Sequence, residues 1–339
     1  MRPLRLIFVV LVTLSVALAG APARAELEDI PYVVSRGDTG HRIARRFGLN
    51  LAGLTVLNEG IDLEHLRAGQ RLVVGRGFRH VHRVLPGEHV AAIASRWGIE
   101  ASALRSWNDL SRDDALEAGM ELVVYSESAM APSTSVGRVD RGTLEDGVPI
   151  PRHDAWRVRT PGRAWVTHFV AEALVDGFTA LRVNHPDAAR VEIRDASRPH
   201  GGSLREHHSH QSGRDVDIAY LRTNCRPGAH GGHDCGHHWT RPSELDAAAQ
   251  WALLHQWIDR GLVEYVFVDH ELQGPLYDAA RAAGASRTEL SHWFQYPRSE
   301  EVRAGIIRHV PRHTDHFHVR FVCAPYDIAC VPSDGSSRD

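Results

Sequence analysis

The chain has 339 residues, of which 43% are hydrophobic and 24% are charged, so it can bury a core and is not wholly disordered. Its formal net charge of −3 gives no net basic field, which argues against nucleic acid as the main partner. All 39 basic residues are arginine, which excludes a lysine nucleophile or Schiff base. Of the 23 histidines, 15 lie between His200 and His318, a concentration that favours metal chemistry over packing. The length predicts about two to three domains.

The N-terminal segment, residues 1–25, has the features of a Sec-type signal peptide. Arg2 and Arg5 precede an apolar stretch, and Ala23 and Ala25 supply the small residues of a cleavage site. The apolar run is short for a bilayer span, so an uncleaved signal anchor is the weaker alternative. We expect cleavage after Ala25, export to the periplasm or the medium, and no membrane span in the mature chain.

The following hundred residues contain an internal repeat with a period of 50 residues. Gly37-Asp38 returns as Gly87-Glu88, and the Leu57-Asn58 pair returns as Trp107-Asn108. The segment 68–74 returns in the same way as 118–124. Each copy predicts a strand, a glycine turn, two helices, a second glycine turn and a closing strand.

This pattern resembles the LysM module, and the two copies cover residues 31–75 and 79–125. The resemblance implies a βααβ fold that binds N-acetylglucosamine-containing glycans in a shallow groove beside the turns. The residues expected in that groove are Gly37, Asp38, Thr39, Gly87 and Glu88. Both copies depart from the family, because Gly40 and His89 stand where leucine is usual. Modules that act only as spacers are therefore the alternative.

A change of composition separates the repeat from the rest of the chain. Residues 126–150 are rich in serine, proline and glycine and predict a flexible linker. Residues 151–333 then predict an α+β domain. Its expected elements are a helix from Val166 to Leu174, a strand at 191–193, a helix capped by Ser243 and Asp246 and ended by Gly261, a strand at 262–268, and a helix at 277–283.

The chain has four cysteines, which in an exported protein suggest two disulfides with three possible connectivities. Sequence proximity favours Cys225–Cys235 and Cys323–Cys330, each of which closes a short loop. The alternative is a zinc site formed by Cys225, Cys235 and His233. It is less favoured because thiols tend to oxidise outside the cytosol.

Two segments of the last domain have the pattern of a metal site. In the segment 207–218, alternation places Asp215 and Asp217 on one strand face and apolar residues on the other. Downstream, His316 and His318 also share a face. Adjacent strands of this kind would present imidazoles and carboxylates in neighbouring rows. Two histidines and one aspartate around an open position are typical of hydrolytic zinc, and the lack of an H-E-x-x-H motif excludes the helix-borne zincin geometry.

These segments, H-x-S-H-Q-x-G-x-D-V-D-I and H-x-x-H-F-H-V-R, resemble the penicillin-insensitive murein endopeptidases of the LAS metallopeptidase group. The resemblance implies a small antiparallel sheet, one catalytic Zn²⁺, and hydrolysis of D-amino-acid-containing cross-links of peptidoglycan, such as D-Ala–meso-diaminopimelate. The implied ligands are His210, Asp217 and His318, with His316 as the general base and with His313 and His207 lining the site. A family disulfide closes where Cys323 and Cys330 lie.

Two departures from this family stand out. Arg214 occupies a position where the family often has leucine, and it is expected to add a charge beside the site. The segment 230–238 is unusually rich in histidine, and we expect an exposed loop there, with an accessory metal patch as the alternative. The expected partners are glycan strands and cross-linked stem peptides. The alternative functions are a D,D-carboxypeptidase and a non-catalytic, zinc-containing protein that binds the cell wall.

Overall fold

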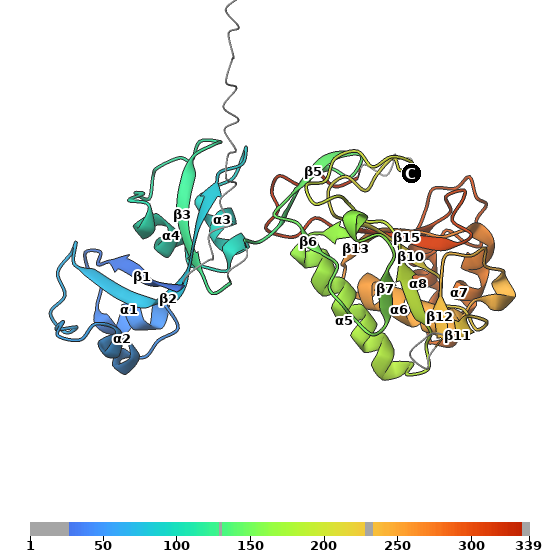
Figure 1. The fold of residues 1–339 in the computed structure, drawn as a ribbon, viewed down its shortest axis with the longest axis horizontal. Helices are drawn as coiled ribbons and strands as arrows, with labels where there is room; N and C mark the ends of the chain where they lie inside the picture. Colours follow the sequence, from blue (N-terminus) through green and yellow to red (C-terminus); the bar gives the residue numbers. More distant parts are fainter. Residues whose placement is uncertain (1–26, 129–130, 228–232, 334–339) are drawn as a thin grey trace, which may run out of the picture.

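The computed structural model describes residues 27–128, 131–227 and 233–333 (Figure 1). The predicted signal peptide and the first part of the histidine-rich segment lie outside the described residues. None of the described helices combines the length and the apolar character that a membrane span needs.

The two repeat copies share a single three-stranded antiparallel sheet of order β1-β2-β3. Its strands are β1 (Leu27–Val33), β2 (Arg71–Arg83) and β3 (Glu121–Ser126). The helices between them are α1 (Gly40–Arg46), α2 (Leu51–Leu57), α3 (Val90–Trp97) and α4 (Ala101–Trp107). Each copy therefore has the predicted βααβ order. Strand β2 closes the first module and opens the second without a break.

The repeated asparagine has the same role in both modules. The Asn58 amide nitrogen donates to the carbonyl oxygens of Leu54 and Val73, at 2.8 and 2.7 Å, and its oxygen accepts from the Val73 N–H at 2.8 Å. Asn108 makes the equivalent three bonds to Leu104 and Val123. Each asparagine thus ties the second helix of its module to the closing strand.

The C-terminal domain is built on a mixed sheet of order β11-β12-β9-β10-β15-β13-β14, with β7 paired to β9. Its strands are β7 (Trp156–Val158), β9 (Arg190–Ile193), β10 (Asp215–Ala219), β11 (Arg226–Pro227), β12 (His233–Cys235), β13 (Val263–Phe267), β14 (Ile307–Arg308) and β15 (His316–Phe321). The central strands β9, β10, β15 and β13 pair in antiparallel fashion, and parallel pairs occur only toward the edges. The antiparallel sheet that was expected thus forms the middle of a larger one.

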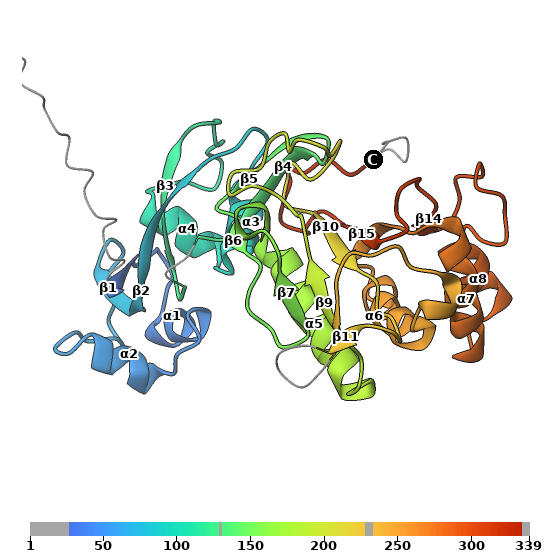
Figure 2. The same cartoon turned by 45° about the vertical axis from the view of Figure 1, so that its right-hand side comes forward.

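Helices pack along this sheet and bury its apolar face (Figure 2). They are α5 (His168–Asn184), α6 (Ala247–Asp259), α7 (His270–Ala282) and α8 (Arg287–Trp293), with short 3₁₀ turns at Pro161–Arg163 and Pro242–Glu244. Val216 of β10 and Phe317 and Val319 of β15 are fully buried in the core. The indole N–H of Trp257 donates to the Ala173 carbonyl at 2.8 Å and joins α6 to α5.

Two predicted helix starts are wrong. The N-cap of α6 is Asp246, whose carboxylate accepts from the Ala249 N–H at 3.2 Å, whereas Ser243 lies in the preceding 3₁₀ turn. Helix α7 begins at His270 rather than near Tyr277, because Asp269 caps it. Its polar first turns hide the helical pattern in the sequence.

The segment expected as a flexible linker is largely ordered and belongs to the C-terminal domain. It contains a hairpin of β4 (Thr134–Arg138) and β5 (Arg141–Glu145), and β6 (Val148–Pro149) pairs with β8 (Trp165–Val166). The Ser135 N–H donates to Asp327 at 3.0 Å, and Leu144 is buried. The small serine and glycine residues here allow backbone segments to pack closely. Composition alone does not distinguish such an ordered segment from a flexible linker.

Both predicted disulfides are present. Cys225 is bonded to Cys235, and Cys323 is bonded to Cys330 just after β15. The alternative zinc site at Cys225 and Cys235 is therefore wrong, because the two sulfurs are bonded to each other.

Candidate metal centre

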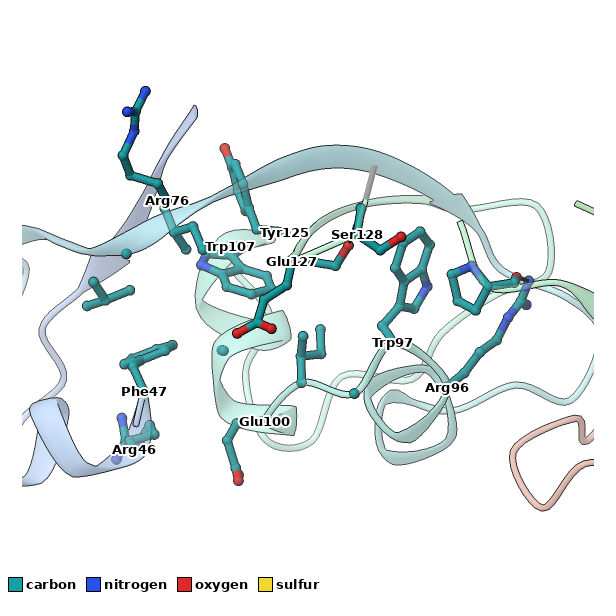
Figure 3. Close-up of a pocket in the computed structure, with 18 of the residues that line it drawn as sticks. Arg46, Phe47, Arg76, Arg96, Trp97, Glu100, Trp107, Tyr125, Glu127 and Ser128 are labelled. Atoms are coloured by element: carbon teal, nitrogen blue, oxygen red, sulfur yellow. Dashed lines mark hydrogen bonds between the residues drawn. The ribbon is translucent and has the colours of Figure 1, made fainter. Parts of the chain in front are cut away.

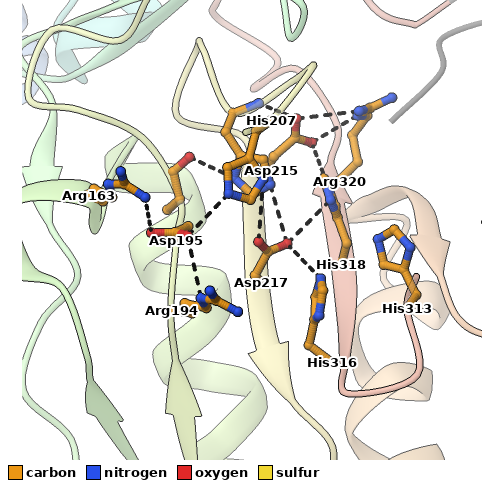
Figure 4. Close-up of polar contacts among 12 residues, drawn as sticks. Arg163, Arg194, Asp195, His207, Asp215, Asp217, His313, His316, His318 and Arg320 are labelled. Carbon is orange, nitrogen blue, oxygen red and sulfur yellow. Dashed lines mark hydrogen bonds and ion pairs between the residues drawn. The ribbon is translucent and has the colours of Figure 1, made fainter. Parts of the chain in front are cut away.

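Strands β10 and β15 bring the two histidine- and aspartate-rich segments together. In the antiparallel register, Asp217 lies opposite His318, Asp215 opposite Arg320, and Ala219 opposite His316. Because side chains alternate along a strand, Asp215, Asp217, His316 and His318 share one face. The predicted rows of imidazoles and carboxylates are therefore neighbours (Figure 4).

His210 reaches the same place from the loop that precedes β10. Its backbone adopts a left-handed conformation with φ of 66°, which is uncommon for a residue with a side chain and is typical of functional sites. Its N–H donates to the Asp215 carboxylate at 3.1 Å, and its ring Nδ1 donates to the Ala196 carbonyl at 2.8 Å. These bonds direct Nε2 toward Asp217.

Asp217 Oδ1 lies at ligand-to-ligand distance from nitrogens of the two predicted histidine ligands. His210 Nε2 lies 3.3 Å from Asp217 Oδ1, and His318 Nδ1 lies 3.4 Å from the same oxygen. Two ligands of a tetrahedral zinc ion, each about 2.0–2.1 Å from the metal, stand about 3.3–3.4 Å apart. His210 Nε2 and Asp217 Oδ1 are also buried and have no hydrogen-bond partner among the described residues. Two buried polar atoms that face each other without hydrogen-bond partners fit a bound cation.

A second triad shares two of these residues. Donor atoms of His207, His210 and Asp217 lie within 4.8 Å of one another. His318 is not in this group, but it lies nearer to Asp217 and is more deeply buried than His207. His207 Nδ1 is 3.8 Å from Asp217 Oδ2 and its side chain is 21% exposed, whereas His318 Nδ1 is 3.4 Å from Asp217 Oδ1 and its side chain is 3% exposed. The second nitrogen of each ring contacts a carboxylate at 3.2 Å, Asp195 for His207 and Asp215 for His318.

The electrostatics of the cluster also fit a cation. Burial alone would lower the pKa of His210, but the Asp217 and Asp215 carboxylates raise that pKa to about 9. Burial acts to raise the pKa of Asp217, yet His210 and His316 hold that pKa well below its usual range. The metal-free cluster thus holds a proton on imidazole, which a metal ion would displace.

Three imidazoles of the site are oriented by carboxylates. His316 Nδ1 lies 2.7 Å from Asp315, His318 Nε2 lies 3.2 Å from Asp215, and His207 Nε2 lies 3.2 Å from Asp195. Such pairs fix the tautomer and the orientation of a histidine. The sequence analysis missed Asp315 and Asp195. Asp315 stands beside His316 in the second motif and could have been found, whereas nothing in the sequence connects Asp195 to His207.

His316 and His313 flank the predicted ligands. His316 Nε2 lies 3.6 Å from Asp217 Oδ1, and the side chain is 15% exposed, so it lies beside the predicted ligands and remains partly open to solvent. Burial acts to lower the pKa of His316, but Asp217 and Asp315 raise it above its ordinary value. His313 is held by the Val310 carbonyl at 3.1 Å, and its ring lies 4.9 Å from that of His316.

Arg214 does not add a charge beside the site, contrary to expectation. Its buried guanidinium donates to Glu264 at 3.2 Å and to the Phe321 and Val331 carbonyls at 2.8 and 3.1 Å. It lies one residue before Asp215, so the alternation of the strand directs it away from the metal ligands. Its role is to anchor the chain after β15.

The histidine-rich segment is only partly an exposed loop. His238 is exposed as expected, but the His237 side chain is 1% exposed and its ring lies 5.3 Å from that of His316. The structure therefore adds His237 to the site. Nothing in the sequence distinguishes His237 from the neighbouring histidines.

In the repeat modules, the two acidic turn residues point inward. Asp38 accepts from the Tyr32 hydroxyl at 2.6 Å and from the Ser35 N–H at 2.8 Å, and its side chain is 7% exposed. The Glu88 side chain is 2% exposed and pairs with His82 at 2.7 Å. Their carboxylates thus stabilise the turns and do not offer a surface to a ligand. The exposed members of the predicted groove are Gly37, Thr39 and Gly87.

A cleft of about 1010 Å³ lies elsewhere on the repeat modules (Figure 3). Residues of both modules line it, joined by a few from the C-terminal domain. The two modules contribute the aromatic residues Phe47, Trp97, Trp107 and Tyr125, beside the charged Arg46, Arg76, Arg96, Glu100 and Glu127. Sequence analysis did not anticipate this gathering of aromatic side chains, which come from segments far apart in the chain.

Comparisons with known proteins divide the chain in the same way. Residues 32–75 and 82–124 match the LysM domain family, and residues 135–260 match the penicillin-insensitive murein endopeptidase family. The autolysin of Enterococcus faecalis (strain ATCC 700802 / V583) is 29% identical over 112 residues, which is 27% of this chain and 15% of the autolysin. The chain thus spans a small part of that relative's length.

Two solved structures also show similarity to parts of the chain. The spore cortex-lytic enzyme SleL of Bacillus megaterium QM B1551 has a TM-score of 0.17 and 15% identity, over 45% of this chain and 31% of that one. The SleL enzyme of Bacillus cereus has a TM-score of 0.15 and 22% identity, over 34% of this chain and 26% of that one.

Proposed function

Because the chain joins two LysM domains to a domain of the penicillin-insensitive murein endopeptidase family, we propose that it is a zinc-dependent endopeptidase of peptidoglycan. It hydrolyses peptide cross-links that contain D-amino acids, such as D-Ala–meso-diaminopimelate, and acts in the periplasm or outside the cell. The observation that carries the proposal is the pair of buried contacts that Asp217 Oδ1 makes, with His210 Nε2 at 3.3 Å and with His318 Nδ1 at 3.4 Å.

In this proposal, His210, Asp217 and His318 hold the zinc ion. The ion supplies Lewis-acid polarisation of a carbonyl and lowers the pKa of a water molecule to about 7. His316 is the general base: Asp315 holds its Nδ1, so Nε2 takes a proton from the attacking water and returns it to the leaving amine. His313 and His207 flank the reacting amide and stabilise the negative charge that develops on its oxygen.

The arrangement of His316 supports catalysis rather than a structural metal site. A structural zinc site is usually closed by a fourth protein ligand. Here the residue beside the triad has its own carboxylate partner and a partly exposed ring, as a general base requires.

The first test of this proposal separates metal hydrolysis from serine chemistry. We expect hydrolysis of cross-linked muropeptides to continue in saturating penicillin, because β-lactams acylate a serine placed beside a lysine and this chain has no lysine. Phenanthroline should abolish the activity, and added Zn²⁺ should restore it, since both disulfides remain closed during metal removal. The measurement is release of monomeric muropeptides, identified by mass. Inhibition by penicillin together with indifference to the chelator would refute the zinc proposal.

The second test concerns the LysM domains. A variant that begins at residue 128 should cleave soluble muropeptide dimers within about twofold of the normal rate, because the catalytic domain has a buried core of its own. Its binding to insoluble sacculi should weaken by at least about tenfold, since both glycan-binding modules are gone. A cut near residue 145 would be unsuitable, because it removes the β4–β5 hairpin and the buried Leu144. Equal sedimentation of the two proteins with sacculi would contradict the targeting role.

A further inference from the structure

The segment between Cys235 and Thr240 lies next to His316, the proposed base. Cys235 is held by its disulfide to Cys225, and the Thr240 N–H donates to the Thr314 carbonyl at 2.8 Å. Both ends of the segment are therefore fixed to the domain. His237 lies between them with a side chain that is 1% exposed, and its ring is 5.3 Å from that of His316.

The two ring nitrogens of His237 have different surroundings. Nδ1 lies 3.2 Å from Glu192 Oε1, so it carries the proton and donates it to that carboxylate. Glu192 also pairs with Arg157 at 2.7 Å and lies 3.6 Å from Arg159. Two guanidinium groups thus share this carboxylate with the imidazole.

The second ring nitrogen of His237 has no comparable hydrogen bond among the described residues. Nε2 is buried, and the described residues provide it with no hydrogen-bond partner. A buried polar atom in this state is unusual in a native protein and indicates a missing ligand, water or ion. With the proton on Nδ1, the nitrogen at Nε2 presents a lone pair and accepts a hydrogen bond.

His237 adjoins the proposed base. Its ring lies 5.3 Å from that of His316, whose side chain is 15% exposed. In the described part of the chain, the group of possible metal-binding atoms within 4.8 Å of one another belongs to His207, His210 and Asp217, and neither His237 nor His318 is in it. We therefore judge the role of His237 from its contact with His316.

We infer that His237 is a further substrate-binding residue of the catalytic site. Its Nε2 accepts a hydrogen bond from an N–H group of the peptide substrate beside the bond that is cleaved, and Glu192 holds the imidazole in the required tautomer. This inference rests on the proposed peptidase function.

The test uses two substitutions of His237, each of which keeps a polar group at the position of only one of the two ring nitrogens. The amide of asparagine occupies the position of Nδ1 and keeps the contact with Glu192, whereas the amide of glutamine occupies the position of Nε2. In the full-length zinc-loaded enzyme, His237→Asn should raise KM for dimeric muropeptide by about 10- to 100-fold with kcat nearly unchanged. His237→Gln should recover most of this loss. The exposed neighbour provides the matched control, because His238→Asn should leave KM unchanged.

Zinc content and melting temperature are measured for every variant, and both should stay at their normal values. A normal KM in His237→Asn would overturn the inference. The inference would also be overturned if His237→Asn and His237→Gln lost zinc, or fell in melting temperature, to the same degree, because the role of His237 would then be structural. A fall in kcat at unchanged KM would overturn it as well.

A binding measurement separates this inference from the proposed function. In a His316→Ala background, calorimetry with the same muropeptide should show a Kd that the added His237→Asn change weakens by the same factor as KM. If the wild-type protein cleaves no muropeptide, the proposed function fails by itself. Equal affinities of the single and double variants would then refute the role of His237.

Discussion

Replacing His318 with alanine should release the bound metal and abolish peptide hydrolysis, whereas replacing His316 should abolish hydrolysis and leave the metal in place. His318 is one of the three proposed protein ligands, so metal affinity should fall by more than the roughly 10- to 100-fold that loss of an outer partner costs. His316 contacts Asp315 and is the proposed base, so its loss should lower kcat by about 10²- to 10⁴-fold. Elemental analysis after dialysis and turnover of muropeptide dimers measure the two effects.

The control for these variants is His208→Ala, because His208 is an exposed histidine of the same motif and should retain metal and activity. A metal-free His316→Ala protein would show that the roles are assigned wrongly. A His207→Ala protein that loses its metal while His318→Ala keeps it would identify the alternative triad as the site.

Replacing Asp215 with alanine should destabilise the protein by about 3–5 kcal/mol, because it leaves a buried charge without its partner. The Asp215 carboxylate is fully buried, accepts from Arg320 Nε at 2.8 Å, and lies 3.2 Å from His318 Nε2. Burial acts to raise the pKa of Asp215, but Arg320 and His318 hold that pKa well below its usual range, so the group is charged. Metal affinity should fall as well, since His318 loses the group that orients it. Urea unfolding and metal titration measure the two consequences.

The same substitution at an exposed ion pair provides the control. Asp176 contacts Arg260 at 3.2 Å on the surface, with 55% of its side chain exposed, so Asp176→Ala should cost at most about 1 kcal/mol. Equal costs for the two substitutions would mean that the buried pair contributes no more than a surface one.

The shared face of the candidate ligands on β10 and β15 could be predicted because it follows from local rules. Alternation along a strand puts Asp215 and Asp217 on the same face of one strand. It also puts His316 and His318 on the same face of the other strand, before anything is known of the fold. Pairing of the two strands follows from their buried apolar faces. The partner of His207 could not be predicted in this way, since Asp195 lies in the loop after β9 and meets His207 only in three dimensions.

The errors have a common physical origin. Composition and spacing describe a residue's own segment, whereas its role depends on what packs against that segment. Ser135 is in a serine-rich stretch that suggests a linker, yet its N–H is fixed by Asp327 nearly two hundred residues later. Arg214 lies in the metal motif, but its partner Glu264 is on another strand. In the sequence, His237 cannot be distinguished from the neighbouring histidines. In the structure, it follows the disulfide-bonded Cys235 and its side chain is buried.

The unbroken strand β2 changes how the two LysM modules can act on a polymer. At about 3.3 Å per residue, its 13 residues form a rod roughly 40 Å long that belongs to both modules. Trp107 of the second module also donates to the Pro31 carbonyl of the first at 2.7 Å, which adds a brace across the junction. A flexible tether lets a second module search for its site, but this pair has a single fixed spacing and orientation. If both modules hold the glycan proposed for them, that glycan has to match the fixed spacing, so this pair should bind extended, regular strands more tightly than short or bent ones.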